Sequence, residues 1–173
     1  MAEARRQLRR TRRRCEQLLR ELHLPAVTDV RELCAGIARL RERPIELLPM
    51  AFPDPDLCGL WIATGSADYL VYERDTSDLH QEHIVLHELG HLLCGHDGVA
   101  DADPTLFREL DPTVLRGVRG RTNYSTLQEQ EAELTASLIH SRFDLIRRPS
   151  PAVDSDLGRR IRRTLAYESP PHR

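Results

Sequence analysis

Residues 81–93 constrain this chain more than any other segment, because they place two histidines four positions apart inside an apolar run. The centre of the segment reads H-E-L-G-H, from His87 to His91. Residues four apart share one face of a helix, so these histidines can direct two ring nitrogens at one metal ion. Glu88 stands beside them, where its carboxylate can take a proton from a water molecule. Zinc suits such a site because it accepts nitrogen and oxygen ligands and keeps one position open for water.

A catalytic zinc ion needs a third ligand from the protein, and two spacings offer one. In the metzincin spacing this ligand lies six residues after the second histidine, which is Asp97 here. That pattern also requires a glycine three residues after His91, where the chain turns back on itself. Cys94 occupies this position and Gly95 comes one residue late, which weakens the metzincin interpretation. The other spacing takes a glutamate from a second helix.

A helical pattern over residues 129–146 offers three glutamates within its first turns. At 100° per residue, Glu129 and Glu133 lie on one face of this helix. Glu131 falls near the opposite, leucine-rich side and is the poorest candidate ligand of the three. Ala132 is small, which would let this helix approach the first one closely. The alternative interpretation is a solvated acidic turn that complements the helix dipole.

These two motifs resemble the ImmA/IrrE family of zinc metallopeptidases, and most of all its short actinobacterial members. The likeness covers residues 25–146. It rests on H-E-L-G-H at residues 87–91 and on E-Q-E-A-E at residues 129–133, with further counterparts at residues 58–61 and 81–83. Family members are gluzincin-like, which means that two histidines and one downstream glutamate hold the zinc ion.

The resemblance implies that His87, His91 and Glu129 bind zinc and that Glu88 is the catalytic base. The downstream motif of the family reads E-x-E-A-N-x-F-A, with Asp in place of Asn in some members. Glu133 stands at that position in this chain. The resemblance therefore implies that Glu133 orients a ligand histidine, as metal-bound histidines usually require.

The start of the second metal helix presents a conflict between capping and metal binding. Thr126 and Glu129 have the spacing of a capping box, but a carboxylate engaged in a cap cannot easily hold a metal ion as well. Ser125 and Gln128 have the same spacing and leave the glutamate free. We therefore expect Ser125 to cap this helix.

Apolar periodicity predicts the remaining elements. A helix is expected over residues 1–23, and Asp29 can cap the next helix. Gly65-Ser66 fits a two-residue turn between two of the strands. Strands are expected at residues 44–48, 58–64 and 67–72. The predicted fold is therefore α+β and mainly helical, with a small, three-stranded, mostly antiparallel sheet and a zincin-like two-helix metal site.

The length of 173 residues suits one core with flanking segments. We expect an Arg-rich N-terminal helix at residues 1–24, the zinc metallopeptidase domain at 25–146, and a C-terminal tail at 147–173 that is a short helix or disordered. Short helices within residues 97–124 are expected to pack over the core.

Charge and cysteine usage bear on partners and compartment. The formal net charge is −2, which argues against a nucleic-acid partner overall. An arginine block at residues 5–14 keeps nucleic-acid contact open as an alternative, although a solvated helix face is the favoured interpretation. The four cysteines show no C-x-x-C pairing, and no signal-peptide pattern precedes them. We therefore expect reduced thiols, a cytoplasmic location and no membrane association.

Two further histidines and one cysteine lie close to the motif. His83 comes one turn before His87 and is expected to pack or to form a hydrogen bond. His96 follows the helix and is expected to be structural. Cys94 is expected to be a small buried side chain and not a metal ligand.

The function that the resemblance implies is that of a zinc-dependent endopeptidase. Its substrate would be a regulatory protein such as a transcriptional repressor, cut at few sites. An oxyanion donor is also expected, and the candidates are His140, Tyr124 and Arg121. The alternative is a non-proteolytic regulatory or toxin–antitoxin partner-binding protein that retains the zinc site for folding. The presence of Glu88 argues against this alternative, because a structural zinc ion has no need of a base.

Overall fold

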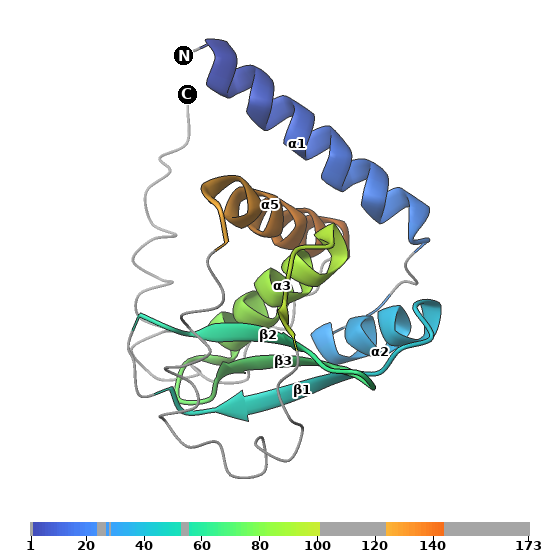
Figure 1. Ribbon diagram of the computed structural model, residues 1–173, viewed down its shortest axis with the longest axis vertical. Coiled ribbons are helices and arrows are strands. Elements are labelled where there is room, and N and C mark those ends of the chain that lie inside the picture. The colour runs from blue at the N-terminus through green and yellow to red at the C-terminus, as the bar shows by residue number, and fades with distance from the viewer. Residues whose placement is uncertain (1, 24–26, 28, 53–55, 101–123, 144–173) are drawn as a thin grey trace, which may run out of the picture.

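The computed structural model describes residues 2–23, 27, 29–52, 56–100 and 124–143, which form helices and one small sheet (Figure 1). The expected α+β class is confirmed. In chain order the elements are α1 (Ala2–Glu21), α2 (Val30–Leu40), β1 (Ile45–Met50), β2 (Gly59–Ala63), β3 (Asp68–Glu73), α3 (Asp78–Cys94), β4 (Val99–Ala100) and α5 (Thr126–Phe143).

The sheet is mixed, so the expectation of a mostly antiparallel sheet is wrong. Its strand order is β1-β3-β2-β4. The β2–β3 hairpin is antiparallel, as the Gly65-Ser66 turn predicts, but β1 pairs with β3 in parallel and β4 pairs with β2 in parallel. The short β4 also adds a fourth strand to the three that were expected. A turn motif specifies only the neighbour that it joins, whereas the pairing of β1 with β3 depends on how the whole chain packs.

Helices α2 and α3 pack on one face of the sheet and build the main core with it. This core includes Leu33 and Ile37 from α2, Leu70 from β3 and Leu89 from α3, all fully buried. Side chains on alternate strand positions point to the opposite face, where Leu60, Ile62 and Val71 form a second, smaller apolar cluster. Helix α3 therefore packs directly on β2 and β3, on the face of the sheet that carries the main core.

Helix α5 packs on α3, and α1 lies beyond α5, so that α3 is enclosed between the sheet and α5 (Figure 1). The crossing of α3 and α5 is close, because Gly90 faces Ala132, which is fully buried. Ser77 caps the start of α3, and Gly95 ends it in the left-handed conformation with φ of 70°. These features fix the position and length of the helix that carries the H-E-L-G-H motif.

Two of the predictions concern segments outside the described residues. The C-terminal tail at residues 147–173 lies wholly outside them, and so do residues 101–123, where most of the expected short helices would fall. In the part of the chain that the structure describes, no helix combines the length and the apolar character needed to cross a membrane.

Candidate metal centre

The contact between α3 and α5 brings together the side chains of His87, His91 and Glu129. The ligand atoms that these three residues offer all lie within 4.8 Å of one another. Nε2 of His87 is 3.1 Å from Nε2 of His91 and 3.3 Å from a carboxylate oxygen of Glu129. The second oxygen of Glu129 is 3.8 Å from Nε2 of His91. Asp97, which the metzincin spacing would use, is exposed and is not a member of this group.

The start of α5 leaves the Glu129 carboxylate free of capping. The backbone N–H of Gln128 donates to Oγ of Ser125 at 3.3 Å, and the backbone N–H of Ser125 donates to Oε1 of Gln128 at 2.9 Å. The predicted Ser125–Gln128 capping box is therefore confirmed. The side chain of Glu129 remains about half exposed, at 48%, beside the two histidines.

His91 is the buried member of the group, with 1% of its surface exposed. Burial and the neighbouring rings of His87 and His96 lower the pKa of His91 to about 3. The imidazole is therefore neutral at pH 7 in the metal-free protein. A neutral ring keeps a lone pair on one nitrogen, which is the form that binds a metal ion.

Glu88 lies on the sheet side of α3, close to β2. A Cβ atom on Gly59 would be 2.7 Å from Oε1 of Glu88, so the absence of a side chain at Gly59 makes room for the carboxylate. Burial, followed by the negative charge of Glu129, raises the pKa of Glu88 to about 8, although a backbone hydrogen bond from Trp61 opposes the change. A carboxylate with a raised pKa is a stronger base than one in water, which suits proton transfer near neutral pH.

Glu133 lies next to the first histidine, on the side away from the ligand atoms. Its Oε2 is 3.5 Å from Nδ1 of His87 and 3.4 Å from Nε2 of His83. This is the position from which a carboxylate can orient His87, as the resemblance implies. His83 lies at the edge of the site, next to the same carboxylate.

The two buried residues that the sequence did not connect with the site are His96 and Glu131. Nδ1 of His96 lies 2.9 Å from Nδ1 of His91, and Nε2 of His96 lies 3.0 Å from Oε2 of Glu131. Glu131 is not one of the grouped ligands, as expected, but it is connected to His91 through His96. A signal for this was present, because a glutamate on the apolar side of a helix requires buried partners.

Tyr124 is the oxyanion candidate that lies at the site. Its ring stacks on His91, with the ring centroids 3.7 Å apart and the planes 18° from parallel. Its hydroxyl is buried and has no hydrogen-bond partner within the described part of the chain. Burial and the charges of Glu88 and Glu129 raise its pKa, so the hydroxyl is protonated and able to donate. His140 is exposed further along α5, and Arg121 lies outside the described residues.

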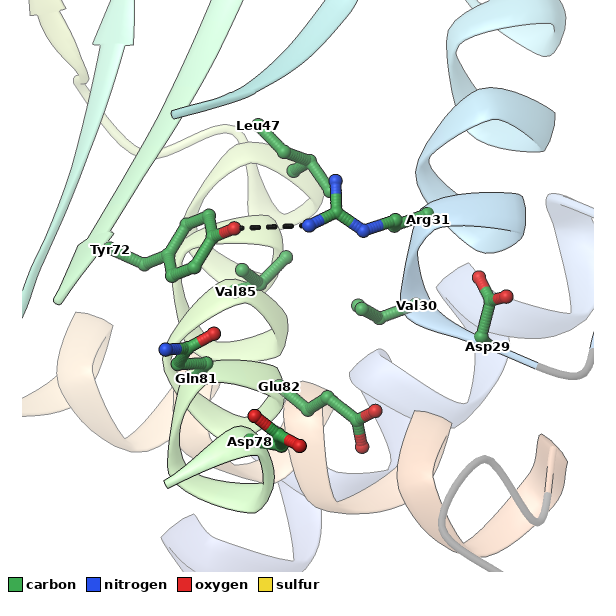
Figure 2. A pocket seen from close by; sticks show the side chains of 9 residues that line it. All are labelled: Asp29, Val30, Arg31, Leu47, Tyr72, Asp78, Gln81, Glu82 and Val85. Carbon is green, nitrogen blue, oxygen red and sulfur yellow. Dashed lines mark hydrogen bonds between the residues drawn. The ribbon is translucent and has the colours of Figure 1, made fainter. Parts of the chain in front are cut away.

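A separate cavity of about 360 Å³ opens on another face of α3, between that helix, α2 and the sheet. Figure 2 shows Arg31 and Tyr72 on one side of this cavity and the carboxylates of Asp78 and Glu82 on the other. The Arg31 guanidinium donates to the Tyr72 hydroxyl at 3.2 Å. None of the residues around the metal-competent group lines this cavity.

Comparison with models of known protein families finds no family that matches this chain, and no curated protein matches it either. The resemblance to the ImmA/IrrE family therefore remains a hypothesis based on the two motifs.

Proposed function

We propose that this protein is a zinc-dependent endopeptidase of the cytoplasm. The observation that carries the proposal is the grouping of His87, His91 and Glu129 beside the buried carboxylate of Glu88. Two imidazoles and one carboxylate form a ligand set used by catalytic zinc sites, with a fourth position left for water or substrate. The cytoplasmic location is supported by the four cysteines, none of which is in a disulfide.

The donor set fits zinc in chemistry as well as in spacing. His91 is neutral, Glu129 is not engaged in the helix cap, and both come from helices that pack directly on each other. A zinc ion bound there would act as a Lewis acid on the peptide carbonyl and would lower the pKa of water toward neutrality. Glu133 would orient His87 from behind through the Nδ1 atom.

In the proposed reaction Glu88 is the general base and then the general acid. Its carboxylate accepts one proton from the attacking water while the water oxygen bonds to the peptide carbonyl carbon. The C–N bond then breaks, and Glu88 gives that proton to the leaving amine. The raised pKa supports both steps, because a base with a pKa near the working pH can take up and release a proton efficiently. Tyr124 would donate its free hydroxyl to the oxyanion.

The substrate peptide is proposed to lie along β2, beside Glu88. Among the described residues, β4 pairs only with Ile62 and Ala63, so the start of β2 has no strand on that side. An extended peptide could add there as a further strand, with backbone hydrogen bonds that do not depend on its sequence. By resemblance, the substrate would be a regulatory protein such as a transcriptional repressor.

The test is a search among transcriptional repressors of the same organism for one that this protein digests. Zinc-loaded parent protein should cut the repressor at few sites, and Glu88→Gln should keep zinc but cut at least about 10²-fold more slowly. A Glu82→Gln variant changes a carboxylate on another face of α3 and serves as the matched control. If the zinc-loaded parent binds the repressor tightly and leaves it intact, the non-proteolytic partner-binding function replaces the peptidase.

A further inference from the structure

The two ring nitrogens of His91 face different surroundings. Nε2 points into the metal-competent group, at 3.1 Å from Nε2 of His87. Nδ1 points away from that group, at 2.9 Å from Nδ1 of His96. The His96 ring continues to Glu131, whose Oε2 lies 3.0 Å from Nε2. His91, His96 and Glu131 are all buried, so water does not compete for these contacts.

Only one arrangement of protons satisfies this row of contacts when His91 uses Nε2 to hold a metal ion. A ligand nitrogen carries no proton, so the proton of neutral His91 must be on Nδ1. His91 Nδ1–H then donates to Nδ1 of His96, which must be an acceptor. The proton of neutral His96 is therefore on Nε2, from which it donates to the ionised carboxylate of Glu131.

We propose that His96 and Glu131 are a positioning pair that holds His91 in the tautomer with a free Nε2. This inference rests on the proposed metal centre and deepens it. His96 accepts the Nδ1 proton and fixes the plane of the His91 ring, while Glu131 fixes the orientation of His96. The Tyr124 ring stacks on the face of the His91 ring and restricts its rotation. The pair acts through His91 and touches neither metal nor substrate.

The positioning pair also connects the Arg-rich helix α1 to the site. The Arg14 guanidinium lies 3.1 Å from Oε1 of Glu131, and the Cys15 thiol donates to the backbone carbonyl of the same residue at 3.8 Å. The Arg14 side chain is largely exposed, so its charge is well screened by water. Its geometric role is to occupy the second oxygen of Glu131, leaving the first for His96.

The test compares two substitutions of His96 in the full-length protein. His96→Phe keeps a ring but has no nitrogen, whereas His96→Gln loses the ring but has an amide oxygen to accept from His91 and an amide N–H to donate to Glu131. The measured quantity is the affinity for Zn²⁺ alone, in competition with a chelator. His96→Phe should weaken zinc binding by about 10- to 100-fold, and His96→Gln should recover most of that loss.

A purely structural role for His96 predicts the opposite order, because phenylalanine would replace the packing of the ring better than glutamine. Thr135→Val is the matched control, since Thr135 is fully buried on the same helix as Glu131 and is not part of the row. It should bind zinc as the parent does. The proposal is overturned if His96→Phe binds zinc within about twofold of the parent, or if His96→Gln binds no better than His96→Phe.

Nitrogen-15 NMR of the parent gives a readout that needs no substitution and no metal ion. The metal-free protein should carry the proton on Nδ1 of His91 and on Nε2 of His96, and the reverse tautomers would overturn the proposal.

The absence of peptidase activity would be a separate result. A parent that binds zinc but cuts nothing leaves the positioning pair intact, whereas a parent without zinc affinity removes the metal centre on which both proposals depend.

Discussion

Gly90 of α3 lies directly against the backbone of Ala132 in α5. A Cβ atom on Gly90 would be 2.6 Å from the carbonyl oxygen of Ala132 and 2.9 Å from its Cα atom. His87 stands three residues before Gly90, and Glu129 stands three residues before Ala132. The close crossing of the two helices therefore determines the distance between a candidate ligand on one helix and a candidate ligand on the other.

Substitution of Gly90 by alanine should push the two helices apart. The added methyl group meets backbone atoms, which cannot rotate away, so the free energy of unfolding should fall by about 1–3 kcal/mol. Zinc affinity should also fall, because Glu129 moves away from the histidines. Urea unfolding and chelator competition measure the two effects. Gly65→Ala is the control, since nothing lies within 4 Å of a Cβ atom there, and it should change neither quantity. A Gly90→Ala protein with parent-like zinc affinity would contradict the role of the crossing.

The ligand set can be tested by comparing zinc content among four variants. His87→Ala and Glu129→Ala should each lose most of the bound zinc, because each removes one of three grouped ligands. Glu88→Gln should retain zinc, since Glu88 is not a member of the group. Asp97→Ala should retain it as well. If Asp97→Ala lost zinc while Glu129→Ala kept it, the third ligand would be Asp97, as in the metzincin spacing. The Glu129 side chain would then have to lie away from the bound metal ion.

Features set by neighbouring residues were predictable from the sequence, whereas features set by distant contacts were not. The Ser125–Gln128 capping box and the β2–β3 hairpin each depend on residues that lie close together in the sequence, and both are present. The parallel pairing of β1 with β3 depends on a crossover that no local pattern encodes. The predicted mostly antiparallel sheet failed for this reason.

The candidate site also has one part that the local sequence predicts and another that depends on contacts between distant residues. His87, Glu88 and His91 belong to one motif, and helical spacing alone puts the two histidines on a shared face. The helical wheel also placed Glu131 correctly on the apolar side of α5. Its partner His96 follows a different helix, so their contact depends on the packing of α3 against α5. Spacing within one helix cannot reveal a hydrogen bond between two.

Ionisation of Glu88 should decrease the stability of the metal-free protein as pH rises through neutrality. Its pKa is about 8 in the folded protein and has an ordinary value of 4.5. Between these values the folded protein holds a proton that the unfolded chain has released, so the free energy of unfolding falls with rising pH. Relative to the ionised form, the stability that the protonated Glu88 carboxyl group contributes is complete below about pH 4.5 and is lost above about pH 8.

At lower pH, the titration of His91 makes the free energy of unfolding rise with pH. Its folded pKa is about 3 and its ordinary value is 6.5, so its contribution rises with pH up to about 6.5. Between pH 6.5 and pH 8 the thiol of Cys15, whose pKa is lowered by a hydrogen bond from Cys94, changes the stability in the opposite direction to Glu88. The contribution of Glu88 is therefore the difference in the free energy of unfolding between the parent and Glu88→Gln, measured with urea in the presence of a chelator. This difference, parent minus variant, should fall by about 1–2 kcal/mol across the window, and equal slopes for the two proteins would show that Glu88 is not the titrating group.

Substitution of Tyr124 by phenylalanine should have opposite effects on stability and on cleavage. The Tyr124 hydroxyl is buried without a partner in the described part of the chain, so its removal should stabilise the metal-free protein by about 1 kcal/mol. The stacked ring on His91 is retained, and zinc affinity should not change. If the hydroxyl donates to the oxyanion, cleavage of the repressor should slow by about 10²–10³-fold in kcat with little change in KM. Parent-like kcat together with the gain in stability would leave the hydroxyl as an unpaired buried group with no part in the reaction.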